Sequence, residues 1–171
     1  MFSLRIAAIA VLLLPLIAAQ KGIVLLRSQN FGAHTWGLRD NGDAYINQGY
    51  SGHAFRIVPG LSGKKDGKKT VSFMSLEHPC SYLRHYNYFL NLESSKNPRN
   101  ANIFDEDATF VPRPNLFFQG YTAFESVNFP NHFIRHAGYR LQIRPNDGSL
   151  LFKRDASFKP EKIGKPKGCG E

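Results

Sequence analysis

Two stretches of the sequence carry one pattern: Ser75-Leu-Glu-His-Pro-Cys-Ser-Tyr-Leu-Arg-His85 and Ser126-Val-Asn-Phe-Pro-Asn-His-Phe-Ile-Arg-His136. Each places serine, proline and an aromatic-aliphatic-Arg-His run at the same offsets. Each is followed by an alternating apolar run and then by Asp107-Ala-Thr-Phe110 or Asp155-Ala-Ser-Phe158. The chain therefore contains an internal repeat, and we expect its fold and its function to be organised by repeat.

A third copy of the pattern lies upstream and lacks the Arg-His pair and the closing aspartate. Residues Leu26 to Phe31 match Phe124 to Phe129, with Ser28 at the serine position. Where the other copies carry Arg-His, this copy reads Trp36-Gly-Leu-Arg-Asp40, and it has Gly52 in place of the closing aspartate. The sequence thus predicts three structural units, of which two keep a complete site.

The residues that follow each signature alternate between apolar and polar side chains, as in Tyr139-Arg-Leu-Gln-Ile143. A period of two is typical of strands with one buried face. Turn signals such as Asn41-Gly42 and Asn146-Asp-Gly148 separate the alternating runs. Because no segment has helix-length amphipathic spacing, the chain is predicted to be all-β.

Three repeats of about four strands each predict a β-trefoil, because threefold closure buries a face that no repeat can bury alone. A propeller is the rival architecture, but propellers have about four to eight blades. In a trefoil, Phe55, Phe110 and Phe158 would be equivalent core residues. The predicted segments are a trefoil over residues 20–158, with repeats at about 23–61, 70–116 and 121–158, and a basic C-terminal tail over residues 159–171.

Residues 1–19 have the composition of a secretory signal peptide. Arg5 precedes an apolar run from Ile6 to Ile17, and the small residues Ala18 and Ala19 follow it. A membrane-spanning helix needs about 20 apolar residues, more than this run supplies. We predict cleavage after Ala19 and a secreted, extracellular protein with no membrane contact after cleavage.

Charge and cysteine content bound the partners and the chemistry. Removal of residues 1–19 leaves 21 basic and 13 acidic residues, a net charge of +8. Cys80 and Cys169 are the only cysteines, and an even count in an oxidising compartment favours a disulfide, with two unpaired thiols as the alternative. Closing such a loop contributes about 4 to 5 kcal/mol in the chain-entropy model. Two distant cysteines do not match a zinc site, so we expect no metal and no cofactor.

The repeated Arg-His and Asp-Ala-Thr/Ser-Phe segments resemble the arabinose-binding domain of fungal alpha-L-arabinofuranosidase B, a β-trefoil carbohydrate-binding module. The stretches nearest to the family pattern run from Phe124 to Pro130, Phe133 to His136, Asn146 to Ser149 and Arg154 to Phe158. The resemblance covers nearly the whole chain after residue 19. It implies a trefoil with one shallow sugar pocket in each competent repeat.

The resemblance also implies which residues bind the sugar. His85 and Asp107 would form one pocket, and His136 and Asp155 would form a second. Tyr86 follows His85, whereas Ala137 follows His136, so stacking of this position on the sugar would make the third repeat the weaker binder. An ionised carboxylate accepts hydrogen bonds from vicinal hydroxyls, and an imidazole supplies a donor or an acceptor. The first repeat is expected not to bind. The alternative is that each His and Asp is a buried pair that pins a hairpin to the barrel.

These features predict a non-catalytic, lectin-like protein that binds arabinofuranosyl side chains of polysaccharides. Glycoside hydrolysis usually needs two carboxylates, whereas each repeat pairs one aspartate with one histidine. The family's catalytic domain is absent from the sequence, and we expect no nucleic-acid partner. The alternative is a basic extracellular matrix or mineral-associated protein that uses the trefoil as a scaffold. Its lysines would bind anionic extracellular polymers: Lys64, Lys65, Lys68, Lys69, Lys159, Lys162, Lys165 and Lys167.

Overall fold

The computed structural model describes residues 22–48 and 53–163. Its twelve strands within these residues are β1 (Ile23–Ser28), β2 (His34–Leu38), β3 (Ala44–Gln48), β4 (Phe55–Pro59), β5 (Val71–Ser75), β6 (Ser81–Tyr86), β7 (Phe89–Ser94), β8 (Phe110–Pro114), β9 (Thr122–Ser126), β10 (His132–Ala137), β11 (Arg140–Pro145) and β12 (Phe158–Lys162). Two short helices, α1 (Ala101–Asp107) and α2 (Leu150–Asp155), complete the regular structure of the described residues.

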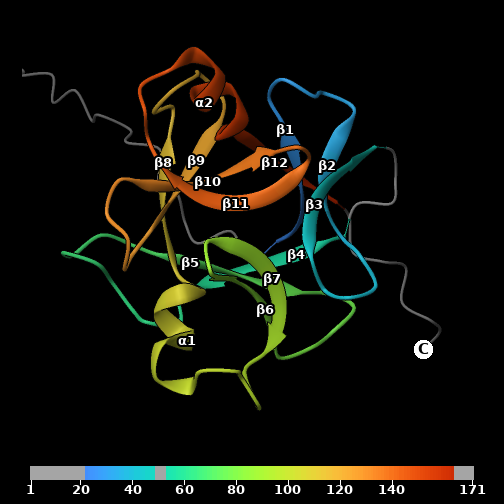
Figure 1. The fold of residues 1–171 in the computed structure, drawn as a ribbon, viewed down its shortest axis with the longest axis vertical. Helices are drawn as coiled ribbons and strands as arrows, with labels where there is room; N and C mark the ends of the chain where they lie inside the picture. Colours follow the sequence, from blue (N-terminus) through green and yellow to red (C-terminus); the bar gives the residue numbers. More distant parts are fainter. Residues whose placement is uncertain (1–21, 49–52, 164–171) are drawn as a thin grey trace, which may run out of the picture.

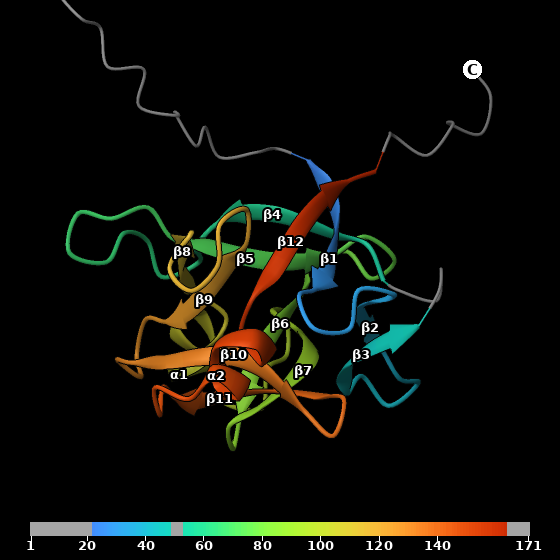
Figure 2. The same ribbon diagram turned by 90° about the horizontal axis from the view of Figure 1, so that it is seen from above.

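Six strands close into a barrel through a ring of antiparallel pairs. β1 pairs with β4, β4 with β5, β5 with β8, β8 with β9, β9 with β12, and β12 with β1. Figure 2 shows the first and last of these strands, β1 and β12, side by side. Closure gives every strand of the ring two hydrogen-bonded neighbours, so the barrel itself has no free edge.

Three hairpins, β2–β3, β6–β7 and β10–β11, gather around the centre of the molecule (Figure 1). β11 pairs with both β3 and β7. The turn carbonyls of Gly42, Tyr88 and Tyr139 each accept a backbone hydrogen bond of 2.8 Å from a strand of the next hairpin. The same bond therefore links first repeat to second, second to third and third to first. This threefold arrangement confirms the predicted β-trefoil.

One hydrophobic core fills the space between the barrel and the hairpins. Phe55, Phe110 and Phe158 are fully buried in it, as their equivalence predicted. Trp36 is also fully buried, and its ring centroid lies 5.0 Å from those of Phe73 and Phe158. The first repeat thus keeps its place in the core even though its polar signature is absent.

Two short helices accompany the strands of this all-β fold. Asn100 caps α1 by accepting a hydrogen bond from the backbone N–H of Asn102, and Ser149 caps α2 by accepting one from Phe152. Each helix has fewer than two full turns, which is too short for an apolar period to be recognised in the sequence. Each ends on the closing aspartate of its repeat.

The barrel also extends further than the predicted end of the trefoil at residue 158. β12 continues to Lys162 and pairs along its length with β1, from Val24↔Lys162 to Ser28↔Phe158. Lys159 and Lys162 therefore belong to a barrel strand and not to the tail.

Several predictions fall on residues outside the described ranges. These are the signal peptide at residues 1–19, the position of Gly52, and Cys169, so the Cys80–Cys169 disulfide stays a prediction. Within the described residues, no helix is both long and apolar enough to cross a membrane.

Candidate functional site

The hairpin register identifies the equivalent positions of the three repeats. His85 and His136 occupy the same position of their hairpins, and Leu38 occupies it in the first repeat. The arginine that precedes each histidine is replaced by Gly37 in the first repeat. In the first repeat, the apolar residues Gly37 and Leu38 therefore stand in place of the Arg-His pair.

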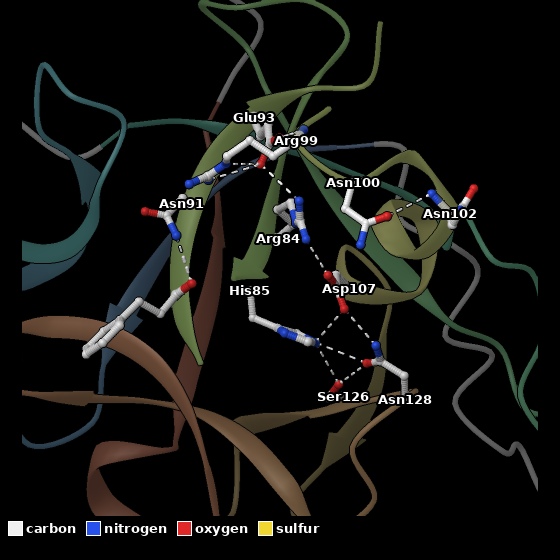
Figure 3. Close-up of polar contacts among 11 residues, drawn as sticks. Arg84, His85, Asn91, Glu93, Arg99, Asn100, Asn102, Asp107, Ser126 and Asn128 are labelled. Atoms are coloured by element: carbon white, nitrogen blue, oxygen red, sulfur yellow. Dashed lines mark hydrogen bonds and ion pairs between the residues drawn. The ribbon is translucent and has the colours of Figure 1, made fainter. Parts of the chain in front are cut away.

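Four side chains meet in what we call the second-repeat site: His85, Asp107, Ser126 and Asn128 (Figure 3). Asn128 Nδ2 donates to Asp107 Oδ1 at 2.7 Å, and Ser126 Oγ donates to Asn128 Oδ1 at 2.8 Å. His85 Nε2 lies 3.0 Å from Asn128 Oδ1 and 3.5 Å from Asp107 Oδ1. Ser126 and Asn128 belong to the third repeat, so the site forms at the junction of two repeats.

This network defines the protonation of His85. Because the Asn128 amide nitrogen donates to Asp107, its oxygen is an acceptor, and the Nε2 atom of His85 must carry the proton. Burial lowers the pKa of His85, an effect that the neighbouring Asp107 opposes. His85 is therefore neutral at pH 7, with its proton on Nε2 and a free electron pair on Nδ1.

The third-repeat site repeats this geometry with His136, Asp155, Ser28 and Asn30. Asn30 Nδ2 donates to Asp155 Oδ1 at 2.7 Å, and His136 Nε2 lies 2.9 Å from Asn30 Oδ1. Burial lowers the pKa of His136 to about 4, although Asp155 acts in the opposite direction. Ser28 and Asn30 come from the first repeat, which lacks a complete site of its own but supplies half of this one.

Each site forms the floor of a surface hollow. The histidine and aspartate of both sites are only 3–4% exposed. The second-repeat hollow has a volume of about 210 Å³ and is lined by His85, Tyr86, Asn87, Tyr88, Ile103, Asp107 and Phe129. The third-repeat hollow has a volume of about 510 Å³ and is lined by Asn30, Phe31, Arg135, His136, Ala137, Gly138, Tyr139, Leu151 and Asp155.

Aromatic rings stand beside each polar floor. The Phe129 ring centroid lies 5.2 Å from that of His85 and 5.6 Å from that of Tyr88. In the third repeat, Phe31 lies 5.3 Å from His136 and 5.5 Å from Tyr139. Both hollows therefore offer hydrogen-bonding groups below and ring surfaces at the side, a combination suited to a small ligand with hydroxyls and a C–H face.

The hairpin tyrosines have an unusual backbone conformation. The φ angle is 69° at Tyr88 and 65° at Tyr139, in the left-handed region that bulky residues rarely adopt. The equivalent turn position of the first repeat is Gly42, with φ of 83°. Both tyrosines precede the first residue of the following strand, so the prediction that they belong to the alternating strands was wrong.

A buried or half-buried arginine fixes each closing aspartate. Arg84 donates to Asp107 Oδ2 and to Glu93 Oε2, and its side chain is 0% exposed. Arg135 donates to Asp155 Oδ2, and its side chain is 16% exposed. The arginines thus hold the carboxylates in place.

The corresponding place in the first repeat has a different set of contacts. His53 Nδ1 accepts a hydrogen bond of 2.9 Å from the backbone N–H of Leu38. His53 Nε2 lies 3.2 Å from Glu77 Oε2 of the second repeat, and Glu77 stands where the other sites have asparagine. A histidine and a glutamate thus meet across this junction of repeats.

The structure brings together the residues that the sequence singled out within each repeat: His85, Tyr86 and Asp107 in one hollow, His136 and Asp155 in the other. Six further residues that line or complete the hollows were not predicted from the sequence: Asn30, Phe31, Asn128, Phe129, Tyr88 and Tyr139. The Asn-Phe pairs could have been found, because they recur at one offset after the repeated serine. They were missed because each pair completes the site of the preceding repeat.

The family model "Alpha-L-arabinofuranosidase B (ABFB) domain" matches residues 25–160. Alpha-L-arabinofuranosidase B of Emericella nidulans is 32% identical over 105 residues, which cover 61% of this chain and 20% of that protein. The otogelin-like protein of Mus musculus is 33% identical over 123 residues, which cover 68% of this chain and 5% of that protein.

A solved structure shares the fold and part of the sequence. The crystal structure of an arabinofuranosidase complexed with arabinofuranosyl-alpha-1,2-xylobiose matches with a TM-score of 0.70 and 25% identity, over 83% of this chain and 31% of that chain. The chain spans only 20% and 16% of the length of two arabinofuranosidase B relatives. Because the family model matches most of its residues, this chain belongs to the alpha-L-arabinofuranosidase B (ABFB) domain family.

Proposed function

We propose that this protein is a secreted, non-catalytic carbohydrate-binding protein that binds arabinofuranosyl side chains of polysaccharides in the second-repeat and third-repeat hollows. Family membership and the arabinofuranosyl ligand of a structural relative support this assignment. A furanose presents vicinal hydroxyls to the carboxylate and imidazole of each floor and a C–H face to the aromatic wall.

The main support for this proposal is that tyrosine occupies the left-handed turn position only in the two repeats with a complete site. Tyr88 and Tyr139 occupy a conformation that costs a non-glycine residue roughly 1 to 2 kcal/mol. The first repeat, which lacks a complete site, has Gly42 there and avoids this cost. A fold requirement alone would be met by glycine in all three repeats. Both rings pack on protein side chains and still leave 43% of Tyr88 and 50% of Tyr139 exposed, so tyrosine at this position in the two complete repeats supports contact with a ligand.

The hollows also differ from hydrolytic sites. Hydrolysis of a glycosidic bond usually takes two carboxylates about 5 to 10 Å apart. One carboxylate lines each hollow, Asp107 in one and Asp155 in the other, and each is held by an arginine and an asparagine. This arrangement supports binding without catalysis.

Calorimetric titration of residues 20–171 with an arabinofuranosyl-decorated xylan oligosaccharide tests the proposal. We expect saturable binding with up to two sites, each with a dissociation constant of roughly 10 µM to 1 mM, because a shallow hollow encloses little of a sugar. Undecorated xylan is the control. Absence of heat with the decorated oligosaccharide, from folded protein, would contradict the proposal.

Replacement of both hairpin tyrosines by glycine separates binding from folding. In Tyr88→Gly/Tyr139→Gly, we expect binding to weaken by roughly tenfold at each hollow, since an aromatic contact contributes about 1 to 1.5 kcal/mol. We expect the free energy of unfolding to change by less than about 1 kcal/mol, because relief of the left-handed backbone offsets the lost packing. Calorimetry and urea unfolding measure the two effects.

The matched control for this prediction is Tyr88→Ala/Tyr139→Ala. Alanine removes the rings but keeps a Cβ in the left-handed backbone, so these variants should lose binding and unfold at a lower urea concentration than the glycine variants. Full binding by the glycine variants would show that the tyrosines do not contact the ligand.

The basic-surface alternative also has a structural basis. Asp66 and Gly67 form a tight turn, and the backbones of Lys65 and Lys68 exchange two hydrogen bonds across it. The turn presents Lys64, Lys65, Lys68 and Lys69 to solvent. Binding of an anionic polymer through these lysines would weaken steeply between low and high salt. Binding in the hollows would change little with salt and would be competed by free arabinofuranoside.

A further inference from the structure

The two hollows differ in size although their polar floors match. The third-repeat hollow, at about 510 Å³, has more than twice the volume of the second-repeat hollow, at about 210 Å³. At two equivalent hairpin positions, the second repeat has Tyr86 and Asn87, whereas the third has Ala137 and Gly138. A Cβ atom added to Gly138 would meet no atom within 4 Å. Truncated side chains therefore leave open space in the third repeat.

The walls around this additional space are apolar. Leu151 and Tyr139 line it and are 62% and 50% exposed. Arg135 and Asp155, the charged residues of the hollow, are bonded to each other. A second sugar unit in this space would face Ala137 and Gly138 without side-chain partners for its hydroxyls, which is unfavourable when those hydroxyls lose water. A flat apolar group suits these walls better.

On the basis of the proposed function, we propose that the third-repeat hollow takes arabinofuranosyl units that carry an aromatic acid esterified to a hydroxyl, whereas the second-repeat hollow takes only the unsubstituted sugar. The sugar occupies the His136–Asp155 floor, and the aromatic acyl group packs against Tyr139 and Leu151. In the second repeat the Tyr86 side chain, which lines that hollow, excludes the acyl group.

Nuclear magnetic resonance titration of the full mature chain reads the two hollows separately. The amide signals of Asn87 and Gly138 report on the second-repeat and third-repeat hollows. The probes are methyl arabinofuranoside and two of its esters, the acetyl ester and the hydroxycinnamoyl ester. In both esters the acyl group is carried by the primary hydroxyl. We expect the unsubstituted glycoside to shift both signals. The hydroxycinnamoyl ester should shift Gly138 at roughly tenfold lower concentration than the glycoside does and should leave Asn87 unchanged.

Exchange of the two hairpin residues provides matched variants. The backbone allows it in both directions, because φ is 49° at Asn87 and 54° at Gly138. Ala137→Tyr/Gly138→Asn should abolish the preference of the third repeat for the hydroxycinnamoyl ester while it still binds the glycoside. Tyr86→Ala/Asn87→Gly should let the second repeat bind this ester.

Three results would overturn the inference, and they are distinguishable. No shift with any probe would overturn the proposed function together with this inference. Equal binding of the glycoside and the hydroxycinnamoyl ester at both hollows would overturn the inference alone. A Gly138 shift that depends on protein concentration without ligand would mean that a second copy of the chain covers the exposed Leu151 instead.

Discussion

Asp107→Ala is expected to lower the free energy of unfolding by about 3 to 5 kcal/mol, the usual cost of removing one partner from a buried ion pair. The Arg84 side chain is 0% exposed, so its guanidinium cannot reach water when the carboxylate is lost. Glu93 remains as a partner of Arg84, but it is shared with Arg99. Urea unfolding followed by fluorescence of Trp36 measures the change.

Asp155→Ala is the internal control for this result. It removes an equivalent arginine pair and an equivalent bond to asparagine, but the Arg135 side chain is 16% exposed and can turn towards solvent. We expect a smaller loss, about 1 to 3 kcal/mol. Equal losses in the two variants would contradict the view that burial of the arginine determines the cost. Because both aspartate variants are expected to be less stable, their binding is measured under conditions in which they are folded.

Lowering the pH from about 6.5 to 4 should reduce the free energy of unfolding through His85 and His136. Burial lowers the pKa of both histidines, to about 4 for His136, below the value of 6.5 of an exposed histidine. Below pH 6.5 the unfolded chain binds protons at these two positions that the folded chain does not bind until the pH reaches the lowered pKa of each histidine. Stability is therefore unaffected by these groups above pH 6.5 and falls as the pH decreases, by up to about 1.4 kcal/mol per pH unit for each histidine.

Urea unfolding at a series of pH values between 7 and 4 provides the measurement. His136→Gln should reduce the slope of the free energy of unfolding against pH by the contribution of about one proton, because glutamine does not titrate. A curve that stays flat for the unmodified protein from pH 6.5 to 5 would show that the histidines protonate in the folded state, and the proposed neutral network would then be incorrect.

Much of the fold could be predicted from the sequence because it depends on recurrence. The two Arg-His signatures and the incomplete upstream copy define three units. Threefold closure then follows, because each unit must bury its apolar face. Phe55, Phe110 and Phe158 could be assigned to the core for the same reason. The short helices could not be found in this way, because six or seven residues give too few turns for a visible period.

The candidate site was predicted only in part. The sequence identified the histidine and aspartate of each complete repeat because they recur together and are absent together from the first. It gave no indication that the left-handed turn position holds Tyr88 and Tyr139, since a φ angle depends on the closed hairpin and its bond to the next repeat. It also assigned the first repeat no part in a site.

The sequence by itself determined the number of repeats, the trefoil, and the histidine and aspartate of each of the two complete repeats. Only the tertiary structure decided that each site lies at a junction, where Asn128 bonds Asp107 across 21 residues of sequence and Asn30 bonds Asp155 across 125. The reason is geometric. Hydrogen bonds act over about 3 Å, and closure of the barrel brings the start of each repeat to the hairpin of the preceding one, whatever their separation along the chain.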